Sequence, residues 1–338
     1  MNGPRVAVVI LNWNGERFLR EYLPSVVKNT PHKIADVIVA DNGSTDSSIS
    51  VLKTDFPDVR LIEFSENHGF AEGYNLAIAG LADEYKYTVL LNSDVRVDDD
   101  WLTPLYDFME SHSKAGAVQP KILSLSDPRK FEYAGAAGGF LDCNGYPYCR
   151  GRIFESVEAD CGQYDAPLQV DWASGAALMV DTALYIKVGG LDKEFFAHME
   201  EIDLCWRMRL AGRELWAVPQ AKVYHLGGGS LPASNPKKTY LNFRNNLLML
   251  YKNLPHEVRG RRLLWRRMLD ILAWAKFIAT FDMKNASALV RAHRDFARMR
   301  LLYPESSLPE KNGRDLLASR PNILVEYYLK GKRLFSEL

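Results

Sequence analysis

The sequence predicts an α/β protein with a mixed, mainly parallel central sheet and a helical region appended at its C-terminal end. In the N-terminal half, short apolar runs alternate with amphipathic stretches, as in parallel strands covered by helices. From about residue 235 the sequence instead has long runs with helical spacing and many basic residues. The chain has 338 residues, of which 47% are hydrophobic and 25% charged, which is typical of a globular protein with one large domain and an appendage.

Strands and helices are expected to alternate in the first hundred residues. The apolar runs predict strands at 6–11, 35–40, 59–64 and 87–92. Helices are expected between them at about 16–29, 45–54 and 70–82, each beginning near Gly, Ser or Asn. Ligands of such sheets bind at the carboxyl ends of the strands. The polar sequences NWNG, DNGSTD and NSD follow three of these strands, so we expect them to line a binding site.

The middle of the chain is less regular. Residues 120–172 show no sustained period and are expected to form a long, substrate-facing insertion. Beyond it the pattern predicts a buried strand at 170–181 and a helix within 189–212 that ends at Gly212. Two further strands are expected at 215–219 and 222–226.

Basic residues are concentrated near the C-terminus. The chain has 42 basic and 42 acidic side chains, but residues 259–300 contain eleven Lys or Arg against three Asp, a net charge of +8. Within the apolar run from Leu263 to Phe281, four charged residues exclude a membrane-spanning helix. Two interpretations stay open. The apolar face packs on the core, or the helix lies on an anionic membrane with Trp265 and Trp274 at the lipid interface. In this run, apolar residues recur at 264, 268, 271, 272 and 275.

Two features of the sequence bear on cellular location and on the state of the cysteines. The apolar run that begins at Val6 leads directly into polar NWNG, so no signal peptide is predicted and we expect a cytosolic protein. The cysteines are expected to be free thiols, since their number is small for a disulfide framework and their spacing fits no common zinc pattern. They are Cys143, Cys149, Cys161 and Cys205.

The acidic stretch LLNSDVRVDDDW offers one candidate metal ligand. A calcium loop is excluded, because Asn92 and Asp94 are followed by the cation Arg96 and the required glycine is missing. The aspartates at 98–100 are expected to be a solvated helix start. Asp94 instead follows an apolar strand at the carboxyl edge of the sheet, where one carboxylate can hold Mg²⁺ or Mn²⁺ together with water and substrate phosphates.

A second acidic cluster, HMEEIDLCWR, offers candidate catalytic groups. Glu200 and Asp203 share one helix face, and Glu201 is turned away by about one hundred degrees. We expect Asp203 to pair with Arg207 on the exposed face. Glu201 begins the helix beside apolar FFAHM, where desolvation would raise its pKa toward that of a general base. His225 ends a strand before GGGS and is a candidate metal ligand.

These motifs, in this order, resemble those of the family 2 glycosyltransferases, which are inverting enzymes of the GT-A fold, and especially their bacterial rhamnosyltransferase-like branch. The resemblance covers about residues 5–250 and is more specific than any one motif, while the basic C-terminal helices resemble that branch more loosely. The motifs are VVILNWNG, DNGSTD, NHGFAEGYN, LLNSD, WASGA, GGLD, FFAHMEEIDLCWR and VYHLGG.

The resemblance implies a donor site and a catalytic base. The family's DxD-type motif, whose last acid coordinates a divalent cation on the donor diphosphate, maps to Asn92, Ser93 and Asp94, with Asn92 in place of the first acid. A histidine after the catalytic helix is a second metal ligand in several members, and His225 matches it. The family's base maps to Glu201, a glutamate in place of aspartate, with Glu200 and Asp203 as alternatives. The nucleotide contacts implied by the other motifs are Leu11, Asn12, Asn14, Asp41, Asn42, Gly69 and Asn75.

Three further residues are expected near the substrates. Arg244 is a candidate phosphate contact, although a helix-capping or salt-bridging role fits it equally well. Trp172 and Gly175 are expected to shape the sugar and acceptor pocket, although Trp172 equally fits the core.

The resemblance implies a Rossmann-like nucleotide-diphospho-sugar transferase domain at 1–234, with a nucleotide-binding half at about 1–95 and an acceptor half at about 96–234. A basic, amphipathic helical region then follows at 235–338. We expect transfer of a sugar, foremost rhamnose, from dTDP-rhamnose or a UDP-sugar to a lipid-linked or surface polysaccharide on the inner face of the cytoplasmic membrane. No nucleic acid partner is expected, and a homodimer stays open.

Two other functions remain as alternatives. A nucleotidyltransferase would share the α/β nucleotide-binding core and the metal, but it usually has a glycine-rich loop ending in a basic residue after the first strand, which NWNGERF lacks. A catalytically silent, sugar-nucleotide-binding scaffold of a membrane glycan-assembly complex is disfavoured by the presence of both Asp94 and Glu201.

Overall fold

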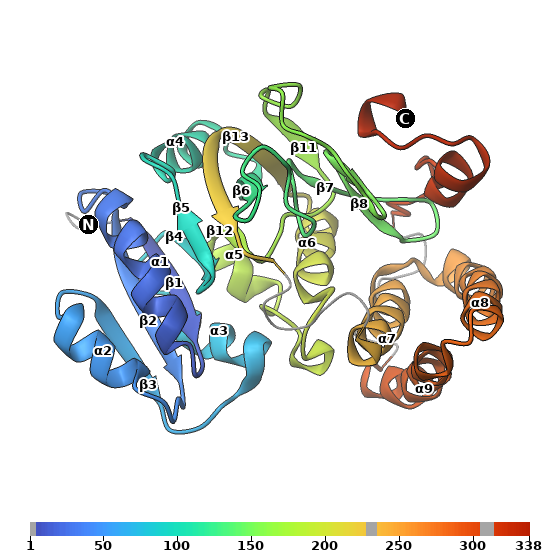
Figure 1. Ribbon diagram of the computed structural model, residues 1–338, viewed down its shortest axis with the longest axis horizontal. Coiled ribbons are helices and arrows are strands. Elements are labelled where there is room, and N and C mark those ends of the chain that lie inside the picture. The colour runs from blue at the N-terminus through green and yellow to red at the C-terminus, as the bar shows by residue number, and fades with distance from the viewer. Residues whose placement is uncertain (1–4, 228–234, 305–313) are drawn as a thin grey trace.

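A mixed sheet forms the centre of the protein (Figure 1). The computed structural model describes residues 5–227, 235–304 and 314–338. Within these residues, nine strands pair in the order β11-β13-β6-β12-β4-β1-β2-β3, with β5 beside β13. The strands are β1 (Val6–Asn12), β2 (Ala35–Asn42), β3 (Arg60–Phe64), β4 (Tyr87–Asn92), β5 (Val95–Val97), β6 (Ala115–Ser124), β11 (Leu168–Val170), β12 (Ala177–Asp181) and β13 (Glu214–His225).

The first four strands are parallel, as the alternating pattern predicts. β1 pairs with β2 on one side and with β4 on the other, and β3 pairs with β2, all in parallel register. β1, β2 and β4 are largely buried on both faces, and successive side chains of β1 enter two different hydrophobic clusters. The carboxyl ends of β1, β2 and β4 therefore lie side by side at one edge of the sheet.

Helices cover both faces of this sheet. The cluster on one face includes α1 (Glu16–Asn29), α2 (Ser48–Asp55) and α4 (Thr103–Ser111). The cluster on the other includes residues of α3 (Gly69–Ala79), α5 (Thr182–Lys187), α6 (Glu200–Leu210) and α7 (Pro236–Asn253). The predicted helices at 16–29, 45–54 and 70–82 thus exist, with shifts of a few residues at their ends.

The second half of the domain differs from the prediction in three places. The expected strand at 170–181 is two strands, β11 and β12, separated by the WASGA segment. The expected strands at 215–219 and 222–226 are one strand, β13. Its pairing register shifts between Val218 and Lys222, at the place where the sequence pattern predicts the end of one strand and the start of the next. In the helix expected within 189–212, only residues from Glu200 onward are α-helical, after the 3₁₀ turn η1 (Lys193–Phe195).

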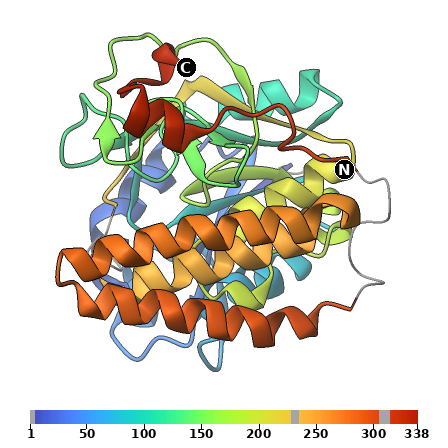
Figure 2. The ribbon, with the colours of Figure 1, turned by 90° about the vertical axis from the view of Figure 1, so that its right-hand side faces the viewer.

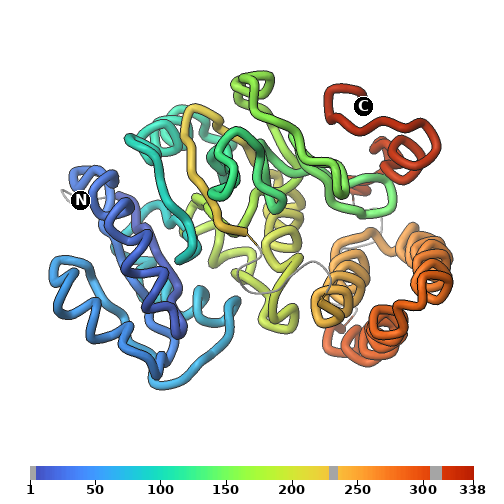
Figure 3. The backbone as a smooth tube through the Cα atoms, viewed as in Figure 1, coloured from blue at the N-terminus to red at the C-terminus, as the bar shows by residue number. Residues whose placement is uncertain are grey.

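The irregular segment at 120–172 contains a second, small sheet. Its order is β10-β9-β8-β7, and no α-helix lies within it among the described residues. The residues of the C-terminal stretch 314–338 lie alongside this sheet (Figure 3), where the Phe335 ring packs 5.1 Å from that of Phe140. The strands are β7 (Gly139–Leu141), β8 (Pro147–Cys149), β9 (Arg152–Ile153) and β10 (Ser156–Val157).

Three long helices form the C-terminal region. Figure 2 shows α7, α8 (His256–Ala279) and α9 (Met283–Met299) side by side, and α7 also packs against α6. None of the described helices is long and apolar enough to cross a membrane. Short turns follow at η2 (Arg300–Leu302), η4 (Val325–Leu329) and η5 (Phe335–Glu337). The domain boundary predicted at residue 234 falls at the end of 228–234, which lies outside the described residues, as does most of the GGGS sequence after His225.

Candidate active site

The ends of β1 and β2 are joined through two buried polar side chains. Asn12 and Asp41 are opposite each other in the parallel register, and Asn12 Nδ2 donates a hydrogen bond of 2.8 Å to Asp41 Oδ2. The other Asp41 oxygen accepts from the backbone N–H of Ser44 at 2.9 Å. Leu11 is opposite Asn92 of β4. The structure therefore brings together the predicted nucleotide contacts of three motifs, and their contact with a nucleotide stays a prediction.

Two other asparagines shape the loops at this edge. Asn14 Oδ1 accepts from the N–H of Thr45 at 2.8 Å, which ties the loop after β1 to the loop after β2. Asn42 accepts from the N–H of His68 and donates to the carbonyl of Gly69, both at 3.0 Å. Gly69 begins α3 with a φ of +79°, a conformation that favours glycine. These residues therefore fix the positions of the loops at the carboxyl ends of β1 and β2.

Asn75 connects α3 to the GGLD segment, which precedes α6. Its Nδ2 donates to the carbonyl of Leu191 at 2.8 Å, and its Oδ1 accepts from the Leu191 N–H at 2.9 Å and from the Tyr185 hydroxyl at 2.7 Å. Since both polar atoms of this amide are used inside the protein, Asn75 holds the GGLD segment in place. A donor contact for it stays a prediction.

Asp94 and His225 form a pair at the carboxyl edge. After β4 the chain turns into β5, whose Val95 is opposite His225 of β13. The turn places Asp94 Oδ1 3.1 Å from His225 Nε2. Asn92 and Ser93 lie in the same turn and are half-buried. By contrast, the aspartates at 98–100 precede α4 without capping it, because α4 begins at Thr103 and its N-cap residue is Leu102.

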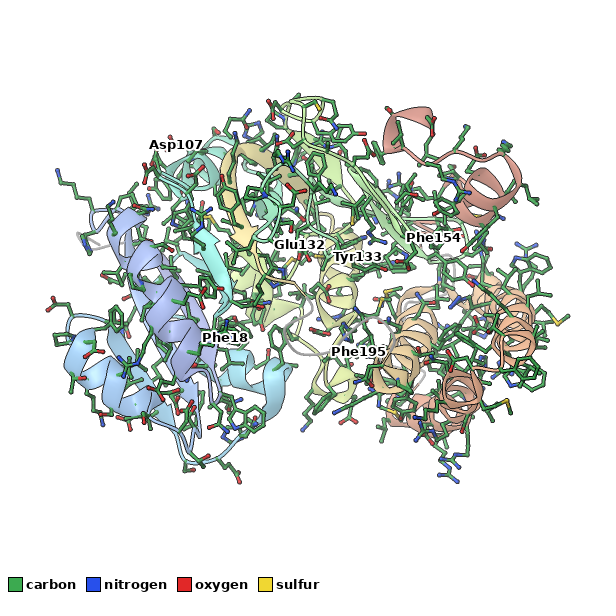
Figure 4. The ribbon with its side chains drawn as sticks, viewed as in Figure 1. Phe18, Asp107, Glu132, Tyr133, Phe154 and Phe195 are labelled. Carbon is green, nitrogen blue, oxygen red and sulfur yellow. The ribbon has the colours of Figure 1, made fainter. Side chains whose placement is uncertain are left out.

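A second acid, Glu132, completes this cluster and was not predicted. Its Oε1 lies 3.6 Å from His225 Nδ1, and its side chain is buried. Figure 4 shows Glu132 near the centre of the molecule, between β13 and α6. Burial lowers the pKa of His225, but the hydrogen bonds and charges of Asp94 and Glu132 outweigh it and raise the pKa to about 10. An imidazolium therefore balances the two carboxylates.

This cluster fits a divalent cation that takes most of its ligands from elsewhere. No group of three or more His, Cys, Asp or Glu in the described part of the chain could by itself hold a metal. Mg²⁺ and Mn²⁺, however, usually keep several waters and bind substrate phosphates, so a carboxylate and an imidazole are enough protein ligands. The two acids already hold a positive charge, and buried His225 Nδ1 has no hydrogen-bond partner.

Helix α6, which carries the candidate bases, begins after a loop with an unusual backbone. Phe196, His198 and Met199 have φ values of +65°, +67° and +73°, which non-glycine residues rarely adopt. Figure 4 shows Phe195, just before this loop, beside α7. Asn245 of α7 is fully buried and its Nδ2 lies 2.9, 2.8 and 2.7 Å from the carbonyl oxygens of residues 195, 197 and 198. One amide therefore holds the strained loop.

Arg244 supports the same loop. Its Nη2 donates to the carbonyls of Glu194 at 3.0 Å and Phe195 at 2.8 Å, and its Nε donates to Asn245 at 2.8 Å. The side chain is buried and, among the described residues, forms no ion pair with a carboxylate. Of the roles left open by the sequence, the backbone contacts agree with a capping role, and the phosphate contact stays a prediction.

Replacing Asn245 with Ala is expected to lower kcat by roughly 10²-fold, because small misplacements of catalytic groups have effects of this size. The donor KM should change little. The matched control is Asn246→Ala, since Asn246 is also buried in α7 but donates to Gly145 instead of the loop. Both variants should have a lower Tm by differential scanning fluorimetry. An Asn246 variant with an equal loss of kcat would contradict a specific role for Asn245.

Two neighbouring glutamates at the start of α6 lack hydrogen-bond partners. Oε2 of Glu200 and Oε2 of Glu201 are both buried without a partner. Burial, and next the charge of Glu201, hold the pKa of Glu200 well above its usual range. Burial raises the pKa of Glu201 to about 7, although backbone N–H groups at the helix start oppose the shift. Glu201 therefore changes charge near neutral pH, as expected of a general base.

Asp203 lies in the interior, so the exposed pairing expected for it is wrong. Its side chain is 0% exposed, and Oδ2 lies 2.9 Å from both Arg207 and Lys252. Oδ1 accepts from Asn253 at 2.8 Å. Burial raises the pKa of Asp203, but Arg207 and Lys252 outweigh it and hold the pKa below its usual range. A fully paired carboxylate of this kind joins α6 to α7 and is not available as a base.

Replacing Asp203 with Asn is expected to reduce the free energy of unfolding by about 3–5 kcal/mol, because two half-buried cations, Arg207 and Lys252, lose a fully buried carboxylate partner. Since the folded-state pKa is lowered, this contribution is present above the unfolded-state pKa and is lost as the pH falls through the folded-state value. Chemical denaturation at several pH values measures it. As a control, Glu21→Gln in the exposed Arg17–Glu21 pair should change stability by less than about 1 kcal/mol. Equal effects of the two substitutions would contradict the buried ion pair.

Trp172 and Gly175 occupy different positions in the WASGA segment. Trp172 is buried, donates through Nε1 to the carbonyl of Phe140 at 3.0 Å, and covers Gly139, where a Cβ atom would lie 2.1 Å from the indole ring. It is therefore a core residue in this structure. Gly175 lies against the catalytic helix, because a Cβ atom there would be 3.6 Å from Cβ of Glu201.

Comparison with known proteins agrees with this geometry. Residues 7–159 match the family described as Glycosyl transferase family 2. The chain is 28% identical to the N-acetylglucosaminyl-diphospho-decaprenol L-rhamnosyltransferase of Mycobacterium tuberculosis over 64% of this chain and 75% of that protein. It is 24% identical to the low-salt glycan biosynthesis hexosyltransferase Agl10 of Haloferax volcanii over 83% of this chain and 91% of that one.

A solved structure with a similar fold is the mannosyltransferase PcManGT of Pyrobaculum calidifontis in complex with GDP-Man and Mn²⁺. The TM-score is 0.53 at 16% sequence identity, and the match covers 88% of this chain and 84% of that chain. At this identity the likeness concerns the fold alone. It confirms the predicted GT-A fold, with its mixed sheet and additional C-terminal helices.

Proposed function

We propose that this chain is a glycosyltransferase of family 2 and that it transfers a sugar, foremost rhamnose, from a nucleoside-diphosphate donor to a hydroxyl group with inversion at the anomeric carbon. The observation that carries the proposal is Glu201, whose pKa of about 7 suits a general base. The family identity replaces the nucleotidyltransferase alternative. A silent scaffold is disfavoured, because it would not need a desolvated carboxylate at this position.

The proposed reaction uses one base. The acceptor hydroxyl loses its proton to the Glu201 carboxylate while its oxygen forms a bond to the anomeric carbon of the donor sugar. The bond between that carbon and the diphosphate oxygen breaks, and the nucleoside diphosphate leaves with the bonding electrons. Attack from the side opposite the leaving group inverts the configuration. Burial holds the pKa of Glu200 well above its usual range, so of the two neighbouring carboxyls Glu201 gives up its proton more readily.

We further propose that Asp94 and His225 hold Mg²⁺ or Mn²⁺ at the donor diphosphate. Such a cation neutralises the charge that develops on the leaving group. Glu132 lies beside the far ring nitrogen of His225, Nδ1, and would keep a proton there if a cation took the place of the proton on Nε2. The support is the pair of ligands at the carboxyl edge and the Mn²⁺ of the similarly folded mannosyltransferase.

The acceptor proposed here is a lipid-linked or surface polysaccharide precursor at the inner face of the cytoplasmic membrane. The similar Mycobacterium tuberculosis enzyme is described as acting on a diphospho-decaprenol glycan, and the basic C-terminal helices suit an anionic lipid surface. dTDP-rhamnose is the proposed donor, with a UDP-sugar second. The bacterial origin and the homodimer that the sequence left open stay predictions.

A thermal-shift panel tests the donor. The intact protein is heated with dTDP-rhamnose, UDP-GlcNAc, UDP-galactose and GDP-mannose, each with and without Mn²⁺. A rise in Tm that requires both dTDP-rhamnose and Mn²⁺ would support the proposed donor. NMR of the transferred sugar then gives its anomeric configuration. Retention of configuration would overturn the single-base reaction, and a shift with another donor alone would replace rhamnose by that sugar.

A further inference from the structure

Helix α8 is turned the opposite way from most surface helices. Its large apolar side chains face away from the protein, with exposed fractions of 64% for Leu264, 53% for Trp265, 51% for Met268, 54% for Ile271 and 67% for Leu272. We call these five residues the outer α8 face. They follow the spacing of a single helical stripe. Of the two interpretations left open by the sequence, packing of this stripe on the core is therefore wrong.

The side of α8 that faces the protein carries charges beside one leucine. Arg259, Arg266 and Asp270 are buried there together with Leu263. Asp270 pairs with Arg266 at 3.1 Å and with His293 of α9 at 2.9 Å. The Arg266 guanidinium also lies 3.9 Å from the centre of the Tyr146 ring. These buried contacts determine the rotation of α8, so its apolar stripe is held outward by the fold.

The apolar surface continues into a groove between α8 and α9. The groove has a volume of about 510 Å³ and is lined by Ile271, Trp274, Leu289 and Val290, with Arg267 and Arg294 also in its wall. Exposed basic side chains lie along α8 and α9 beside the face and the groove, whereas the three acids between 259 and 300 are buried (Asp270) or half-buried (Asp282 and Asp295). The exposed basic residues are Arg261, Lys276, Lys284, Arg291, Arg294, Arg298 and Arg300.

We propose that the outer α8 face and the α8–α9 groove dock the enzyme on an anionic lipid bilayer, with the apolar side chains in the boundary between headgroups and acyl chains. This inference rests on the proposed function and names the surface by which the enzyme reaches a lipid-linked acceptor. Apolar side chains ringed by cations match the order of groups in an anionic membrane, which has hydrocarbon beneath and negative charge above.

A second copy of the chain suits this surface less well. Two such faces packed together would bring the surrounding Lys and Arg residues of both copies close to one another, and the acids of 259–300 that reach the surface in the described structure, half-buried Asp282 and Asp295, are too few to balance them. Negatively charged headgroups supply that balance. The surface therefore favours lipid over self-association.

Sedimentation with lipid vesicles tests the proposal on the full chain. Wild-type protein is mixed with vesicles of phosphatidylcholine alone or with 30% phosphatidylglycerol, a composition chosen as roughly that of an anionic leaflet. We expect binding to the anionic vesicles that weakens with added salt. The double variant Leu264→Glu, Leu272→Glu should bind at least about tenfold less. The matched control is Ile186→Glu on α5, where an apolar residue with an exposed fraction of 45% lies outside the surface.

Tryptophan fluorescence supplies a second measurement that does not depend on the double variant. Brominated lipids should quench the wild-type emission, and the paired substitution of Trp265→Phe with Trp274→Phe should remove most of that quenching. Failure of the wild type to bind anionic vesicles would overturn the proposal. It would also be overturned if the wild type bound no vesicles but formed a dimer in ultracentrifugation, and the double variant were a monomer. Transfer to a water-soluble acceptor, measured without vesicles, should survive in the double variant, which separates failure of docking from failure of the proposed reaction.

Discussion

Replacing Glu201 with Gln is expected to slow sugar transfer by about 10²–10⁴-fold, the usual contribution of a general base. Glutamine keeps the shape of the side chain but cannot accept the proton of the acceptor hydroxyl. Donor binding should be nearly unchanged, because Glu201 begins α6 and the predicted nucleotide contacts lie on β1 and β2. Transfer kinetics at saturating donor, together with a donor titration by calorimetry, measure the two effects separately.

The pH dependence provides an independent check on this role. Since the base acts in its ionised form and burial raises the pKa of Glu201 to about 7, activity should be low in acid, rise as the pH passes about 7, and then level off. Donor binding should not follow this curve. A profile with its acidic midpoint near pH 4.5 would mean that Glu201 is not the titrating base.

Glu200→Gln is the matched control for Glu201. It changes the adjacent, more deeply buried carboxyl, whose pKa burial holds well above its usual range. Replacing it with neutral Gln should leave the pKa of Glu201 and the acidic limb of the profile nearly unchanged, because burial of Glu201 itself is what raises its pKa. If Glu200→Gln abolishes transfer and Glu201→Gln does not, the two roles are exchanged.

Replacing Asp94 with Asn should remove nearly all transfer at ordinary Mn²⁺ concentrations, because the proposed cation then loses its carboxylate ligand. We expect a fall of roughly 10²-fold or more in both the affinity for Mn²⁺ and the rate. Calorimetry and the electron paramagnetic resonance of Mn²⁺ measure metal binding without any turnover. Wild-type Mn²⁺ affinity in this variant would contradict the assignment of Asp94.

Two controls distinguish a metal ligand from a general effect of charge. Asp99→Asn removes an equal charge from an exposed position five residues further on and should leave Mn²⁺ affinity unchanged. Glu132→Gln retains the shape of the side chain behind His225 but weakens its hold on the ring, so Mn²⁺ affinity should fall by about 10-fold or more. Equal affinities for Glu132→Gln and the wild type would remove Glu132 from the site.

The predictable part of the site consists of residues within a few positions of a strand end or a helix start. Asp94 follows an apolar strand, and the polar residues after β1 and β2 follow theirs, so the parallel pattern alone predicts that they meet at one edge. Partners that come from distant segments of the chain could not be predicted in the same way. Asp203 was expected in an exposed pair with Arg207, but Lys252, 49 residues further on, encloses it in the interior.

The residues that were missed lie far from the motifs in sequence. Glu132 comes from the segment without a sustained period, and its contact with His225 spans most of the insertion. Asn245 lies in α7, about 50 residues after the loop at 195–198 that it holds through hydrogen bonds. Each acts through a contact that no local pattern describes.

By itself, the sequence determined the α/β class, the GT-A fold and the acids that carry the proposed chemistry, because strand and helix periods and the motifs at their ends are local properties of the chain. Only the tertiary structure decided which of these acids are paired or desolvated, what holds the loop before Glu201, and which way α8 faces. The physical reason is that a helical period shows that an apolar face exists, whereas contacts with other segments decide where that face points. In α8, buried Arg266 and Asp270 take the inward side, and the apolar stripe is left outside.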